Sequence, residues 1–215
     1  MNRTTRVVGG AALLAAAAVA AYPWLLRSWY LTWGTRADEA DRALPGDDLM
    51  PAPDILSTRA ISIDAPPMAV WPWLVQMGTG RGGAYTYDWI ENLLGLGMHS
   101  ADEILPEFQH LSVGDMLPVG PRGPGMRAEI VDPGRTLVFR SEEGTWVWIF
   151  ELVAEDGGTR LISRNRIATP NASLASRAVH RTVMEPGSLV MERKMLLGIK
   201  QRAERLAPAM AQGRT

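Results

Sequence analysis

The middle of the chain contains five short runs of hydrophobic and polar residues, which Pro/Gly-rich or Gly-rich breaks separate. The runs cover residues 115–120, 126–131, 135–141, 145–155 and 159–168. Short strands at such even spacing predict an antiparallel meander whose strands are joined by hairpins. In the fourth run, alternate positions form one wide apolar face, made of Trp146, Trp148, Phe150 and Leu152.

Two segments outside the meander have the period of a helix. In the first, Pro66 and Pro67 stand at a helix start, where a missing N–H is harmless. One face of this helix holds Val70, Trp73, Leu74 and Met77, and Pro72 is expected to kink the helix or limit it to short turns. The second runs from about Pro186 to Leu206, and its apolar stripe is Met191, Met195, Ile199, Ala203 and Leu206. Such a stripe is typical of a helix laid on a sheet.

Weaker signals indicate two further short helices. One is expected to start near Thr86, as its N-cap, and to end at Gly95. The spacing of Ser100 and Glu103 fits a capping box, so a third short helix is expected there. Pro106 would stop it.

The stretch before these helices contains Gly78, Gly80 and Gly83 in the G-x-G-x-x-G spacing of a dinucleotide-binding turn. Such a turn needs a strand before it and a helix that begins at its last glycines, so that the amino end of the helix meets the pyrophosphate. Here a helix precedes the glycines and an aromatic stretch follows them. We therefore interpret the glycines as a hinge between two short helices, and no cofactor is expected.

The predicted order is a strand, short helices, a block of antiparallel strands and a long final helix. The first strand contains Ile61 and Ile63, which alternate with polar residues. Strands in one block with helices segregated from them define an α+β fold. A curved sheet that grips one long helix often leaves a cavity between them, which the short helices would close.

The amino end carries twenty uncharged residues, Val7–Leu26, between Arg6 and Arg27. At 1.5 Å per residue such a helix is about 30 Å long, the thickness of the hydrocarbon core of a bilayer. Aromatic residues near its end resemble an interfacial belt, namely Tyr22, Trp24, Trp29, Tyr30 and Trp33. A retained transmembrane anchor over residues 1–33 is favoured. The alternative is a signal peptide with an Ala-Val-Ala cleavage site at residues 18–20.

Basic residues on either side of this run favour an amino terminus in the cytoplasm. The chain would then cross the cell membrane once, with its globular domain on the other side. Residues 34–57 are rich in Asp, Pro, Ala and Gly, and they are expected to be a linker lying on the domain surface. The folded domain is expected over residues 58–206, and residues 207–215 are expected to be a disordered tail.

Composition excludes several classes of function. The chain has 215 residues and a net charge of −1, so no global electrostatic argument points to nucleic acid. It has no cysteine, which excludes disulfides, thiolate nucleophiles and cysteine-ligated metals. The three histidines, His99, His110 and His180, lack a ligand spacing, so no metal site is expected.

From about Thr58 to Leu206 the chain resembles the SRPBCC superfamily, also called START-like or polyketide-cyclase-like, which has the helix-grip fold of the birch-pollen allergen. The opening ISIDAPPMAVWPWLVQMG is similar to the first strand and helix of that superfamily. Residues 71–115, from WPWLVQMG to HLSVGD, are similar to an actinobacterial branch of it. The resemblance implies a helix-grip fold, but it leaves function open because the superfamily includes lipid carriers, hormone receptors, cyclases and dehydratases.

Polar and aromatic residues are dense around the glycine hinge. They are interpreted either as ligand contacts at the mouth of a cavity or as a capped, water-facing helix with packed aromatics. The ligand-binding candidates are Arg81, Tyr85, Tyr87, Trp89, Trp146, Trp148, Met191 and Met195. Asp88 and His99 are the candidates for an acid–base group, since burial can move a pKa toward neutrality. Arg164 and Arg166 lie on the same face of their strand as Arg160. These arginines either form a solvated outer face of the sheet or reach into the cavity.

Two hypotheses for function follow. The first is a membrane-tethered binding or carrier module for a hydrophobic small molecule, lipid-like or polycyclic, in an internal cavity. The second is a cyclase- or dehydratase-type enzyme that uses the same cavity, and a structural partner of a membrane complex is a third possibility. Binding is favoured over chemistry, because no pair of reactive residues is linked by a recognisable spacing.

Overall fold

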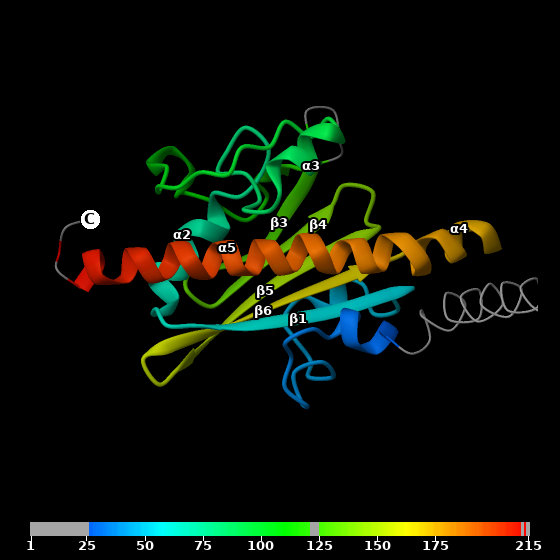
Figure 1. Cartoon of the computed structure of the whole chain (residues 1–215), viewed down its shortest axis with the longest axis horizontal. Helices are drawn as coiled ribbons and strands as arrows, with labels where there is room; N and C mark the ends of the chain where they lie inside the picture. The colour runs from blue at the N-terminus through cyan, green and yellow to red at the C-terminus, as the bar shows by residue number, and fades with distance from the viewer. Residues whose placement is uncertain (1–25, 121–124, 212, 214–215) are drawn as a thin grey trace, which may run out of the picture.

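The computed structural model describes residues 26–120, 125–211 and 213, and it shows a curved antiparallel sheet with a long helix along one face (Figure 1). The sheet has six strands in the order β1-β6-β5-β4-β3-β2. The strands are β1 (Ile55–Ile63), β2 (Met116–Pro118), β3 (Gly125–Asp132), β4 (Thr136–Ser141), β5 (Trp146–Glu155) and β6 (Gly158–Ile167). The five runs therefore form the predicted meander, and β1 closes one edge by pairing with β6.

The short helices before the meander and the long final helix follow the predicted order, but a further short helix before the final one was not predicted. They are α2 (Pro67–Val75), α3 (Asp88–Leu93), α4 (Leu174–Val179) and α5 (Glu185–Ala211), and the π-helix η3 (His180–Met184) joins the last two. Short 3-10 turns lie at η1 (Asp47–Leu49) and η2 (Pro106–Phe108). Together α4, η3 and α5 form one rod that extends beyond the sheet (Figure 1).

The core lies between α5 and the inner face of the sheet. The predicted stripe of α5 faces this core, where Met195, Ile199 and Ala203 are buried. On β5 the predicted apolar face contributes Phe150 and Leu152 to the same cluster. The α+β fold and the grip of the sheet on the final helix are therefore as predicted.

The outer face of the sheet is covered by residues 34–54, which we expected to link the anchor and the domain. Leu44 and Met50 of this segment are buried and pack in one cluster with Val138 and Ile149 of the sheet. Burial of these apolar side chains holds the segment on the sheet.

Three arginines of β6 lie beneath this covering segment. Arg160 donates to both carboxylate oxygens of Glu39, at 2.8 and 2.7 Å. Arg164 and Arg166 each donate to one oxygen of Asp47, at 2.6 and 2.8 Å. The shared strand parity is confirmed, but the expected solvated face is wrong, because all three arginines are buried. Alternation along a strand shows which residues share a face and not which segment covers it.

The capping box at Ser100 and Glu103 does not start a helix, and that prediction is wrong. The hydroxyl of Ser100 donates to Asp88 at 2.6 Å instead of accepting from a helix N–H. The Gln76 side chain then binds the Glu103 carbonyl oxygen and the Leu105 N–H, at 3.1 and 3.0 Å. These long-range hydrogen bonds replace the helical ones that the local pattern indicated.

The ends of α3 agree with the prediction only at its carboxyl side. Gly95 follows the helix with a φ of 75°, the left-handed conformation that closes helices. At the amino side Tyr87 holds the N-cap position, without a side-chain capping bond, so Thr86 is not the cap.

No helix in the described ranges is both long and apolar enough to cross a membrane. Residues 7–25 of the predicted span lie outside those ranges. The described chain begins with helical residues 26–31, which contact the start of α5 through a salt bridge between Arg27 and Glu185.

Candidate functional site

The three glycines of the G-x-G-x-x-G spacing form a tight loop after α2. Gly78, Gly80 and Gly83 have φ angles of 119°, 71° and 71°, which glycine adopts without steric cost. Gly78 and Gly83 exchange backbone hydrogen bonds of 2.9 and 3.1 Å, and these close the loop. The loop joins two short helices, as predicted, and lacks the preceding strand that a dinucleotide-binding turn needs.

Arg81 holds this loop against the end of α2. Its guanidinium donates to the backbone oxygens of Val75 and Met77, at 2.9 and 3.1 Å. These carbonyl groups lie at a helix end, where no intrahelical partner is available. The guanidinium also stacks over the Phe108 ring at 4.3 Å, and burial lowers the pKa of Arg81. The contacts of Arg81 are those of a helix cap.

Tyr85 is buried next to the loop and supports two residues of a pocket described below. Its hydroxyl donates to the backbone oxygen of Trp73 at 2.9 Å, and its ring meets the Trp73 ring edge-on at 6.0 Å. Arg202 of α5 lies 4.8 Å from the centre of the Tyr85 ring. Burial raises the pKa of Tyr85 well above its ordinary value, so its phenol is a neutral donor. Its φ of 58° is a strained conformation for a residue other than glycine.

The acid–base candidates lie on the surface beside α3. Asp88 accepts hydrogen bonds from the backbone N–H and the hydroxyl of Ser100, at 2.9 and 2.6 Å. The side chain of His99 is 95% exposed, with Nδ1 4.0 Å from the Asp88 carboxylate. In this arrangement Asp88 fixes the loop after α3, and His99 is in contact with solvent.

The other candidates fall into separate environments. Tyr87 faces α5, where the Lys194 ammonium lies 5.8 Å from its ring centre. Trp89 projects into solvent from α3. On α5, Met195 is buried in the core and Met191 is half-buried. The structure therefore does not gather these four candidates around one cavity.

Trp146 and Trp148 lie on the inner face of β5, as predicted. Their rings are stacked, with centroids 5.5 Å apart and planes inclined by 21°. The indole N–H of Trp146 donates to Asn165 at 2.8 Å, and that of Trp148 donates to Ser163 at 3.0 Å. Because both N–H groups already have acceptors, the half-buried rings offer mainly apolar surface.

A buried polar cluster joins β1, β6 and α5 next to these rings. At its centre Glu192 accepts hydrogen bonds from Arg59, from the Ser163 hydroxyl at 2.6 Å and from the Asn165 amide at 3.2 Å. Arg59 donates further to Ser188, at 2.9 Å. Both carboxylate oxygens of Glu192 are therefore occupied by partners from the protein, which suits a structural link between sheet and helix better than proton transfer.

Sequence reasoning did not find this cluster. One signal was present: Glu192 occupies a position on the buried side of α5, between Leu189 and Leu196. A charged residue at such a position needs a buried partner. Its partner Arg59 is 133 residues away in the chain, which no local pattern reveals.

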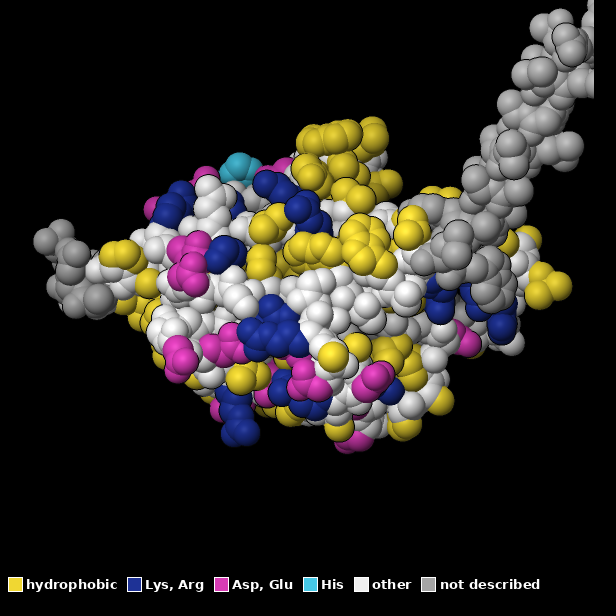
Figure 2. All heavy atoms as spheres, turned by 60° about the horizontal axis from the view of Figure 1, so that its bottom comes forward, with side chains coloured by type: hydrophobic (Ala, Val, Ile, Leu, Met, Phe, Trp, Pro, Cys, Tyr) yellow, Lys and Arg dark blue, Asp and Glu magenta, His cyan; other side chains and the backbone are white. Residues whose placement is uncertain are grey.

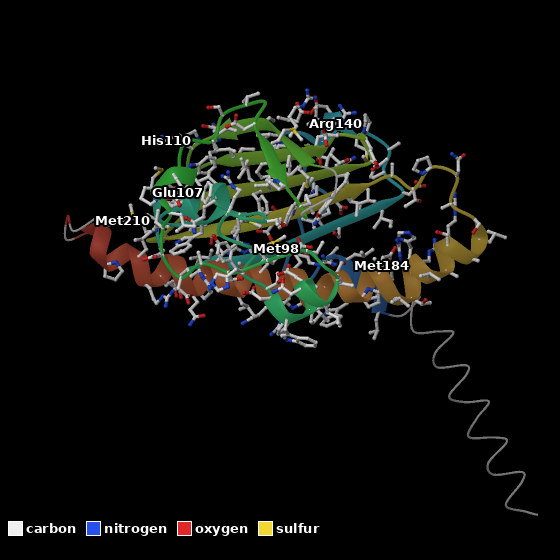
Figure 3. All side chains as sticks on the ribbon, turned by 90° about the horizontal axis from the view of Figure 1, so that it is seen from above. Met98, Glu107, His110, Arg140, Met184 and Met210 are labelled. Atoms are coloured by element: carbon white, nitrogen blue, oxygen red, sulfur yellow. The ribbon has the colours of Figure 1, made fainter. Side chains whose placement is uncertain are left out.

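An open pocket of about 580 Å³ lies where α2, the loop before η2 and the end of α5 meet. Figure 3 shows Met210 of α5 and Glu107 of η2 at this end of the molecule, far from Met184. Its apolar walls are Pro72, Trp73, Ile104, Pro106, Leu206 and Met210. Its charged residues are Asp102, Glu103, Arg202 and Arg205. We call this the α2–α5 pocket.

The α2–α5 pocket includes an unused hydrogen-bond donor in its wall. The indole nitrogen of Trp73 is buried and has no acceptor among the described residues. A buried donor without an acceptor is costly, and such groups are rare. Arg202 in contrast is fully engaged, donating to the Ala101 carbonyl oxygen and to Asp102, each at 2.8 Å.

The order of elements and the grip of the antiparallel sheet on α5 define the class of fold, which is a helix-grip fold. Neither a protein-family model nor a curated protein matches the sequence.

Several solved structures are similar to this chain at low sequence identity. MLL2253 from Mesorhizobium loti is 17% identical, over 70% of this chain and 98% of that one, with a TM-score of 0.43. KanY is 13% identical, over 70% and 97%, with a TM-score of 0.46. The polyketide-cyclase-like protein Cgl2372 from Corynebacterium glutamicum is 18% identical, over 76% and 97%, with a TM-score of 0.36.

Proposed function

We propose that this domain binds a hydrophobic small molecule, lipid-like or polycyclic, in the α2–α5 pocket, and that residues 7–26 hold it at the cell membrane. The observation that carries the proposal is the pocket itself. Its volume of about 580 Å³ falls within the range of small-molecule sites, and its walls are mainly apolar.

The chemistry of the pocket favours an apolar ligand with one polar acceptor. Six apolar side chains would shield most of the ligand from water, and this burial would supply the affinity. An oxygen of the ligand could accept from the Trp73 indole after a small movement of the wall, which would remove the cost of the unpaired donor. Arg205, which is exposed at the rim, suits a polar end of the ligand.

Binding is the better supported activity, because the acid–base candidate Asp88 and the buried Glu192 are both engaged by the protein. Asp88 holds Ser100 and Glu192 holds Arg59, and neither lines the α2–α5 pocket. Turnover of polyketide or hydroxylated substrates that Asp88→Asn abolishes, with the fold intact, would instead favour a cyclase- or dehydratase-type enzyme.

The test is native mass spectrometry of the full chain, released from lipid nanodiscs after gentle purification. We expect the natural chain to carry a bound small molecule, and Leu206→Trp to lose it, because the larger ring fills the pocket. Gln201→Trp is the matched control, since it adds the same ring at an exposed position on the same helix. Equal retention of the molecule by both variants would refute the α2–α5 pocket as the site.

A further inference from the structure

Six exposed apolar side chains lie on or next to α3 and on η3 and α5. Trp89, Leu93 and Leu94 project from α3 and are 69%, 80% and 70% exposed. Val183, Met184 and Val190 are exposed on η3 and the first half of α5. Figure 2 shows apolar side chains gathered in a projecting patch at the upper edge of the molecule. We call these six residues the apolar face.

The two parts of the apolar face lie on the same side of the sheet. In Figure 3, α3 and the outward side of α5 both face away from the strands. The Lys194 ammonium, 5.8 Å from the Tyr87 ring, links α5 to the start of α3. Exposed apolar residues that are scattered need no explanation, but a contiguous set marks an interaction surface.

The chain enters the domain beside this face. Helical residues 26–31 contact α5 through the Arg27–Glu185 salt bridge at 2.9 Å, and they carry Leu26 and Trp29, which are exposed. The uncharged run Val7–Leu26 leads directly into this helix. A bilayer that holds this run therefore comes close to η3 and the apolar face.

The charges beside the apolar face suit anionic lipids. A surface pocket of about 510 Å³ next to it is lined by Arg27, Arg177 and Arg181. Its acidic residues are Asp54 and Glu185, and Glu185 pairs with Arg27, so the three arginines exceed the acidic residues by one positive charge. Cationic residues near a bilayer surface are attracted to negatively charged headgroups.

We propose that the apolar face lies on the bilayer, with α3 inserted at the level of the headgroups and α5 running along the membrane surface. Apolar burial and the neighbouring arginines would act together, as they do in other interfacial helices. The inference rests on the membrane tether in the proposed function and gives the tethered domain a defined orientation.

The absence of cysteine from the chain permits a direct test. Leu93→Cys in the full chain is labelled with an environment-sensitive fluorophore and reconstituted into phosphatidylcholine–phosphatidylglycerol vesicles. We expect a blue shift of the label emission and strong quenching by spin-labelled lipids. Asp156→Cys, in the exposed β5–β6 turn at the far end of the sheet, is the control and should remain unquenched. Vesicles of phosphatidylcholine alone should give weaker quenching at residue 93.

The possible outcomes separate this inference from the proposed function. Flotation of the protein with vesicles while the label at residue 93 stays in water would refute docking and leave the tether intact. Failure to float would refute the tether and docking together, whereas ligand retention tests the α2–α5 pocket separately. A buried label that spin-labelled lipids do not quench would show that the face pairs with a second copy, and would overturn the proposal.

Discussion

At the scale of single residues, we expect the buried ion pairs of the covering segment to contribute strongly to the free energy of unfolding. Glu39 is 4% exposed and accepts two hydrogen bonds from Arg160. We expect Glu39→Ala to lower the free energy of unfolding by about 3–5 kcal/mol, because it leaves a buried guanidinium without its partner. Glu155→Ala removes a partner of the exposed Arg36 and should cost far less. Urea unfolding of both variants gives the comparison.

The same residue predicts a dependence on pH. Burial raises the pKa of Glu39, but hydrogen bonds from Arg160 and from the Arg36 backbone outweigh it and lower the pKa below its ordinary 4.5. A carboxyl with a lowered folded-state pKa contributes stability above the unfolded pKa and loses it as the pH falls. The natural chain should therefore lose stability below about pH 4.5, more steeply than Glu39→Ala. Parallel slopes of the two would contradict the pair.

Glu91 should give the opposite dependence of stability on pH. Its burial in α3 raises its pKa, the Thr86 hydroxyl partly opposes this, and the nearby Asp88 carboxylate raises the pKa further. Ionisation of this carboxyl in the folded state then costs stability as the pH rises above the unfolded value. Glu91→Gln should raise the melting temperature at pH 7 and leave it nearly unchanged at pH 4. A lower melting temperature at pH 7 would refute this assignment.

At the scale of elements, we expect the covering segment to detach from the sheet when its ion pairs with β6 are removed. Asp47 alone bonds both Arg164 and Arg166, so Asp47→Ala removes two ion pairs at once. We expect trypsin to cut this variant faster at Arg36 and Arg42, with the sheet still folded by circular dichroism. Asp48→Ala, its exposed neighbour in η1, is the control. Equal cutting rates would mean that the Asp47 ion pairs are not needed to hold the segment on the sheet.

The same scale shows what the sequence could predict. The strands of the meander and the stripe of α5 follow from periodicity, because each needs one buried face. The false helix at Ser100 and the unpredicted burial of Arg164 share one cause. In both, hydrogen bonds between residues distant in the chain decide the conformation, and a local pattern carries no record of them.

The candidate site was harder to predict than the fold. Arg81 and Tyr85 are polar and aromatic residues at a glycine hinge, which predicts ligand contact, but in the structure both make contacts within the protein. Trp73 was expected only as part of a helix face, yet it lines the α2–α5 pocket. Packing and ligand contact use the same residue types, so composition alone does not separate them.

At the scale of the whole molecule, the covering segment limits how far the domain can move relative to residue 26. As a free coil, the 24 residues from 34 to 57 would span about 27 Å and let the domain turn freely above a bilayer. Instead, residues 34–54 pack on the outer face of the sheet. The salt bridge between Arg27 and Glu185 also fixes helical residues 26–31 to α5. In the membrane-tethered arrangement that we propose, the domain would therefore be held rigidly, and its orientation to the bilayer would follow from the direction of the chain at residue 26.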